Sequence, residues 1–171
     1  MTDPRYPIGK FHRPDVIDDK TISEWIETIE NHPKKLRDVV EGITEKELAT
    51  PYREGGWTVK QVIHHIGDSH LNSYLRFKWA LTEENPLIKV YDEKIFAEGI
   101  EYEAPIEISL NFIESLHAKW VHLLRNLSRE DLERTFQHPE AKRTTSLSFN
   151  LAIYAWHCEH HLAHIKLVTG N

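Results

Sequence analysis

The sequence of 171 residues predicts an all-α protein, a four-helix bundle with a long crossover connection and an extended N-terminal arm. Two observations predict this fold. In four long stretches, apolar residues recur at the spacing of an amphipathic helix, and no stretch shows the convincing alternation of a strand. The length and the 40% share of hydrophobic residues fit one compact domain over residues 1–171.

The arm and the first long helix are predicted from prolines and a capping residue. Residues 1–18 hold three of the eight prolines, which favours an extended arm. The arm leads to a helix cap expected at Asp18 or Thr21. Apolar residues then keep helical spacing over residues 25–43, and Pro33 is expected to kink this helix.

The second long helix follows a short turn and a glycine pair. Thr44 and Glu47 have the spacing of a capping box, which predicts one short helical turn. Two glycines then interrupt the chain. Thr58 is the expected N-cap of a long helix that runs toward Glu83, since apolar residues keep one face throughout.

The second half of the chain predicts a crossover and two more long helices. Residues 87–105 form a long connection with one helical turn after Asp92, and such a connection can cross a bundle. The third long helix is predicted over residues 106–127. After a short turn and a polar stretch, the fourth runs over residues 146–168 and stops at Gly170.

Composition excludes several classes of protein. The formal net charge of −6 repels phosphate backbones and anionic lipids, so nucleic acid and membrane surfaces are not expected partners. No stretch reaches the roughly 20 apolar residues that span a bilayer, and the first residues lack the apolar run of a signal peptide. The single cysteine, Cys158, cannot form an internal disulfide. We therefore expect a soluble cytoplasmic protein.

Histidine is the unusual feature of the composition, because seven of the twelve histidines fall in two clusters. The clusters are His64, His65 and His70, then His157, His160, His161 and His164. On a helical wheel the second cluster shares the apolar stripe, so these imidazoles should be buried and need partners. A divalent metal is one such partner, since histidines four residues apart can converge on one ion. His157 with His161 has this spacing, and so does His160 with His164.

The second helix offers His65 as the preferred third ligand, because it lies on the flank of the apolar face. His64 is expected to point about 100° further from the core. Asp68 could orient a ligand or polarise a bound water, or could simply be solvated. Cys158 points away from His157, so a thiolate ligand or nucleophile is not favoured. The remaining histidines are interpreted as core or surface residues: His12, His32, His117, His122 and His138.

Three segments together resemble the YfiT-like branch of the DinB superfamily. They read PYREGGWTV at residues 51–59, QVIHHIGDSH at residues 61–70 and WHCEHHLAHI at residues 156–165. Many members of the superfamily have Arg-Gly-Gln after the double histidine. This chain has Leu-Ala-His there, as expected of the YfiT branch, and the role of His164 is left open.

The resemblance implies a four-helix bundle and a divalent metal held by His65, His157 and His161. It also implies a homodimer. Zinc is the metal we expect first, and nickel or iron also suit imidazole ligands. Catalytic residues and the roles of Asp68 and His160 are not assigned.

Three functions are compatible with such a site. Similar proteins are described as metal-dependent hydrolases that act on small molecules, and three imidazoles leave a coordination position open for water. Other relatives are S-transferases that use a low-molecular-weight thiol such as bacillithiol, and the open position could equally activate a thiol. The third alternative is a bundle that binds metal without catalysis. We predict the hydrolase.

Overall fold

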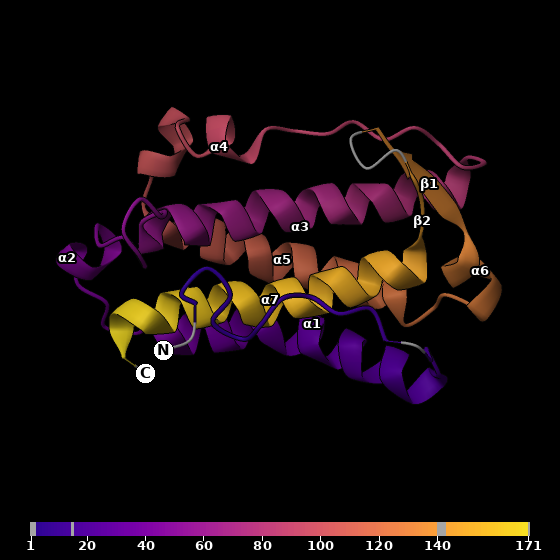
Figure 1. The fold of residues 1–171 in the computed structure, drawn as a ribbon, viewed down its shortest axis with the longest axis horizontal. Helices are drawn as coiled ribbons and strands as arrows, with labels where there is room; N and C mark the ends of the chain where they lie inside the picture. The colour runs from indigo at the N-terminus through magenta and orange to yellow at the C-terminus, as the bar shows by residue number, and fades with distance from the viewer. Residues whose placement is uncertain (1–2, 15, 140–142, 171) are drawn as a thin grey trace.

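A computed structural model describes residues 3–14, 16–139 and 143–170, and four long helices form its bundle (Figure 1). These are α1 (Asp19–Val40), α3 (Val59–Thr82), α5 (Ile106–Leu124) and α7 (Leu147–Thr169). Helix α1 packs against α7 and α5, and α3 packs against the same two helices. The order around the bundle is therefore α1, α7, α3, α5, which confirms the predicted four-helix bundle.

The helix ends follow the predicted capping residues. The side chain of Asp18 accepts a hydrogen bond from the backbone N–H of Thr21 and begins α1. Thr58 and Gln61 form a reciprocal capping box at the start of α3, as the sequence predicted for Thr58. Helix α7 ends at Gly170, whose φ of 74° lies in the left-handed region that favours glycine.

The connections between the long helices contain short helices. Helix α2 (Glu45–Leu48) follows the predicted capping box, and α4 (Glu93–Phe96) is the predicted turn after Asp92. The crossover connection also contains a 3-10 helix, η1 (Ile100–Glu103). This second turn was not predicted from the sequence. Helix α6 (Arg129–Glu133) precedes the last part of the chain.

The expectation of no strand is wrong in one place. Strands β1 (Thr135–His138) and β2 (Arg143–Ser146) pair as an antiparallel hairpin in the stretch interpreted as polar. Phe136 is the one strongly apolar side chain in the two strands, and it is only 1% exposed. Backbone bonds to Pro86 and Ile88 join β1 to the crossover connection. Four residues per strand are too few for alternation to be recognised in the sequence.

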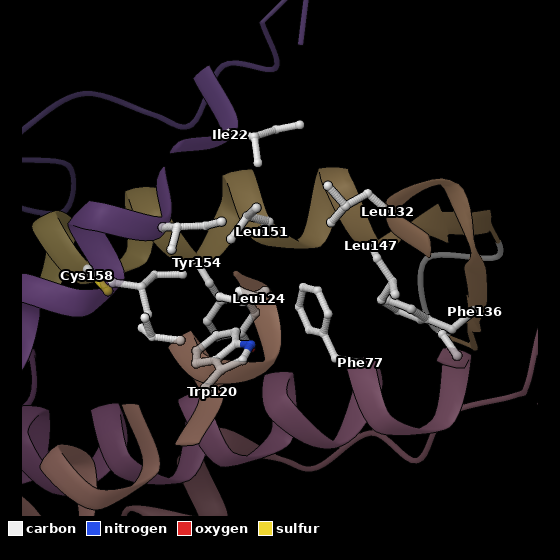
Figure 2. Close-up of a cluster of buried hydrophobic side chains, with 14 of the residues drawn as sticks. Ile22, Phe77, Trp120, Leu124, Leu132, Phe136, Leu147, Leu151, Tyr154 and Cys158 are labelled. Carbon is white, nitrogen blue, oxygen red and sulfur yellow. The ribbon is translucent and has the colours of Figure 1, made fainter. Parts of the chain in front are cut away.

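The core consists of two apolar clusters along the bundle axis. The first includes Phe77, Trp120 and Leu151, which Figure 2 shows among α3, α5 and α7. The second includes Leu36, Ile66, Ile113 and Ile165. On each long helix a histidine lies in the sequence between residues of the two clusters: His32, His70, His117 and His157. The bundle therefore contains a layer of histidines, one from each long helix.

The N-terminal arm lies along α7 (Figure 1). The ring of Phe11 contacts those of Phe149 and Trp156 edge to face, at 5.6 and 6.1 Å between centroids. The ring of Tyr6 lies 6.1 Å from that of His160. Residues 1, 2 and 15 of the predicted arm lie outside the described residues. In the part of the chain that is described, no helix is long and apolar enough to cross a membrane.

Candidate metal centre

The three predicted ligands converge at one point of the bundle. His65 comes from α3, and His157 and His161 come from adjacent turns of α7. One ring nitrogen of each lies within 4.8 Å of the others. The ring centroids are 4.3 Å apart for the pair on α7, and 5.4 and 4.9 Å from His65 to His157 and His161. Metal–nitrogen bonds of about 2.0–2.1 Å hold two ligand nitrogens at most about 4.2 Å apart, so small shifts of the rings would let all three nitrogens bind one ion.

The protonation of these imidazoles suits metal binding. Burial lowers the pKa of His65 to about 4. Burial, with neighbouring imidazoles second, holds the pKa of His157 and His161 well below the ordinary value. The buried Nδ1 of His65 also has no hydrogen-bond partner among the described residues. At neutral pH the three rings are uncharged and offer lone pairs, so the donor set fits a divalent cation.

A cavity of about 750 Å³ opens onto the three histidines. Its wall comes from the arm, the turn before α3, helix α4 and helix α7. Charged side chains are prominent in this wall: Arg5, Arg53, Glu93, Lys94 and Glu98. A small polar molecule can therefore reach the point where the ligand nitrogens converge.

His160 and His164 line the same cavity but are held by aromatic rings. His160 stacks on Trp156 at 4.1 Å, and His164 stacks on Tyr52 at 4.0 Å. In the described part of the chain, the groups of three ligand atoms within 4.8 Å of one another contain neither residue. The alternative pair allowed by the sequence spacing is therefore not joined by a third ligand.

The prediction for His64 is wrong, because this side chain is buried and only 5% exposed. Its Nδ1 lies 2.7 Å from the hydroxyl of Ser109, and its Nε2 lies 3.1 Å from the carbonyl oxygen of Ala104. Asp68 accepts a hydrogen bond of 2.7 Å from the hydroxyl of Tyr102. The crossover connection covers this flank of α3, which a helical wheel of α3 alone could not reveal.

Two histidines interpreted as ordinary take part in a buried cluster. His32 and His117 lie in the core beside His70, with ring centroids 4.9 to 5.6 Å apart. His32, His70 and Cys158 also place ligand atoms within 4.8 Å of one another. A wheel of each helix could have found them, since His32 follows Ile29 and His117 follows Ile113 on apolar stripes. His12 and His122 are exposed.

Comparisons with known proteins agree with this architecture. The sequence profile described as the DinB superfamily matches residues 28–165. A protein of Oceanobacillus iheyensis named "Putative metal-dependent hydrolase" is 55% identical over 161 residues, which cover 94% of this chain and 93% of that protein. A Bacillus cereus protein with the same name is 51% identical over 165 residues, or 96% and 95% of the two chains.

A solved structure is similar over almost the whole length. YfiT from Bacillus subtilis, described as "a probable metal-dependent hydrolase with an unusual four-helix bundle topology", matches with a TM-score of 0.95 and 43% identity. The match covers 99% of this chain and 97% of that one. On the profile, the relatives and the fold together, the chain belongs to the DinB superfamily.

Proposed function

We propose that this chain is a metal-dependent hydrolase in which His65, His157 and His161 bind one divalent metal at the base of the cavity. The observation that carries the proposal is that one ring nitrogen of each of the three histidines lies within 4.8 Å of the other two. The names of the relatives from Oceanobacillus iheyensis and Bacillus cereus support it. The chemistry supplied by such a metal is Lewis acidity, which lowers the pKa of water to about 7.

The residues of the chain hold and present the substrate in this proposal. Three imidazoles leave at least one coordination position free, and the cavity gives that position access to solvent. Arg53 and Lys94 on the cavity wall can bind a carboxylate or another anionic group of a small molecule, whereas the guanidinium of Arg5 already binds Asp3. Zinc is the metal we propose, and nickel or iron is also compatible with imidazole donors.

A thiol S-transferase is the second candidate, and the same cationic side chains favour it. Some low-molecular-weight thiols carry carboxylates, which these side chains could bind. A cavity of about 750 Å³ has room for a thiol together with a small acceptor. The free position at the metal would then take the thiol, whose thiolate form is the nucleophile.

One set of assays separates the candidates. The purified protein is analysed for metal, stripped, reloaded with zinc, nickel or iron, and offered amide, ester and epoxide substrates with and without low-molecular-weight thiols. Hydrolysis without thiol is the expected result, and it should disappear on stripping. Strict dependence on a thiol would contradict the hydrolase and support the transferase. Metal binding without turnover of any substrate would support a non-catalytic bundle.

We also propose that the protein forms a homodimer, on the basis of the family resemblance. Light scattering should then give twice the chain mass of 20.1 kDa. A mass equal to that of one chain would contradict the dimer and leave the metal site unaffected.

A further inference from the structure

A chain of hydrogen bonds runs from a backbone carbonyl of α1 to His157, one of the histidines of the candidate metal site. The carbonyl oxygen of Ile29 lies 2.7 Å from Nδ1 of His117, on α5. Nε2 of His117 lies 2.7 Å from Nδ1 of His70, on α3. Nε2 of His70 lies 3.0 Å from Nδ1 of His157, on α7. Three imidazoles are thus joined nitrogen to nitrogen across the histidine layer.

The carbonyl determines which nitrogen donates and which accepts in each of these hydrogen bonds. A carbonyl oxygen can only accept, so Nδ1 of His117 must carry the proton. Burial lowers the pKa of His117 to about 4, so the ring is neutral and its Nε2 is an acceptor. His70 must therefore donate from Nδ1, which leaves its Nε2 as an acceptor. The hydrogen bond to His70 then requires the proton of His157 on Nδ1.

We propose that His117 and His70 are positioning residues that fix the Nδ1–H tautomer of His157, so that its Nε2 lone pair is presented to the metal. The inference rests on the proposed metal site. Histidine ligands commonly donate their second N–H to a carboxylate or a carbonyl, which fixes their tautomer and orientation. Here the carbonyl acts from a distance, through two further imidazoles.

The bonds to His70 also decide against a second metal at the buried group of His32, His70 and Cys158. Both nitrogens of His70 are already engaged, at 2.7 and 3.0 Å. A metal bound there would have to break one of these bonds. Burial also raises the pKa of the Cys158 thiol well above its ordinary value, which disfavours the thiolate that metals require.

The first test uses the metal-free protein and needs no activity. Two-bond proton–nitrogen correlation spectra of the imidazoles report which ring nitrogen carries hydrogen. At neutral pH we expect His117, His70 and His157 all in the Nδ1–H form. An Nε2–H form in any of the three would overturn the proposal. This readout stays decisive even when the wild-type protein binds no metal, a result that would refute the proposed function instead.

The second test measures metal affinity by competition with a chelator. His117→Leu removes the acceptor for His70, and we expect a loss of affinity of about 10–100-fold, as for other outer-shell partners. His117→Gln should restore most of the affinity, since its Oε1 can accept from Nδ1 of His70. His32→Leu is the matched control, because the His32 ring contacts the same cluster and neither of its nitrogens has a partner among the described residues.

Two outcomes of this second test would overturn the proposal. An unchanged metal affinity in His117→Leu would show that the chain of hydrogen bonds does not affect His157 as a metal ligand. An equal loss in His32→Leu would show that packing of the cluster, and not hydrogen-bond direction, supports the site. Thermal unfolding of each variant reports whether it is folded. Where His117→Leu does not fold, the tautomers of the wild-type protein decide the question.

Discussion

Two sets of histidines meet in this bundle and use the same side chain differently. The cavity set (His65, His157, His160, His161 and His164) lines the cavity. The interior set (His32, His70 and His117) is buried, and two of its members bond to each other. A nitrogen beside a cavity is available to a ligand from solvent, whereas a nitrogen in the core must find its partner within the protein. Access to the cavity, and not residue type, separates the two roles.

The two sets also differ in their ring nitrogens that have no hydrogen-bond partner. In the cavity set, Nδ1 of His65 is unpartnered among the described residues and lies in a group that can hold a metal. In the interior set, both nitrogens of His32 are unpartnered in the core of the described structure. An imidazole of the cavity set can gain a metal as its partner, whereas the two unpartnered nitrogens of His32 lower the free energy of unfolding.

The largest expected effect concerns the cavity set alone. His161→Ala should weaken metal binding by more than about 100-fold, because loss of a mere outer-shell partner already costs 10–100-fold. His160→Ala, which removes another imidazole of the same cavity, should leave most of the affinity. Metal content after purification and chelator competition measure both. Loss of metal in His160→Ala with retention in His161→Ala would reverse the assignment.

Acid should affect both sets. Burial gives His65 and His117 pKa values of about 4, against about 6.5 in the unfolded chain, so the unfolded chain binds more protons between these values. Protonation of these histidines should not reduce the free energy of unfolding of the metal-free protein above about pH 6.5, and should lower it progressively as the pH drops toward 4. For each histidine, the fall is about 1.4 kcal/mol for every pH unit that separates its folded and unfolded pKa values. Urea unfolding at several pH values measures this, and a flat profile would contradict burial of neutral rings.

Within the interior set, neighbouring substitutions should have opposite signs. His32→Leu replaces a buried ring without hydrogen bonds by an apolar side chain of similar volume, so it should raise the free energy of unfolding by about 1–3 kcal/mol. His117→Leu removes two hydrogen bonds and should lower it. Urea unfolding of the metal-free variants measures both changes. Destabilisation by His32→Leu would mean that this imidazole has a partner.

The smallest effect tests whether stability and metal binding are separate. Thr58→Ala removes the N-cap of α3, the helix that carries one histidine of each set, and should lower the free energy of unfolding by about 1 kcal/mol. Metal affinity should not change, since the cap lies two turns from His65. A parallel loss of affinity would indicate that the start of α3 positions its histidine.

Periodicity and capping were sufficient to predict the four long helices. Asp18 and Thr58 begin helices where predicted, and Gly170 ends one. The hairpin escaped prediction because β1 and β2 have only four residues each, and such short strands show no alternation that can be recognised in the sequence.

For the candidate site, the sequence indicated which face of each helix the histidines occupy, but not how deeply each side chain is buried. Helical spacing and the family resemblance together selected three histidines that do converge, and their role as ligands stays a prediction. The burial of His64 was missed, because the crossover connection covers it. The chain of hydrogen bonds through His117 was missed because it links four helices. The positions of these helices relative to one another depend on the packing of the whole bundle.

The hydrogen-bonded layer has a consequence for how the bundle assembles. Leucine and isoleucine contacts have no direction, so a helix that slides along its neighbour can exchange one apolar contact for another, at a cost in packing. The hydrogen bonds of the histidine layer cannot be exchanged in this way. Its three bonds, at 2.7, 2.7 and 3.0 Å, link all four long helices, and a slip of one turn, about 5.4 Å, would break them. These hydrogen bonds therefore favour one register of the helices, because a misaligned bundle would leave several ring nitrogens buried without partners.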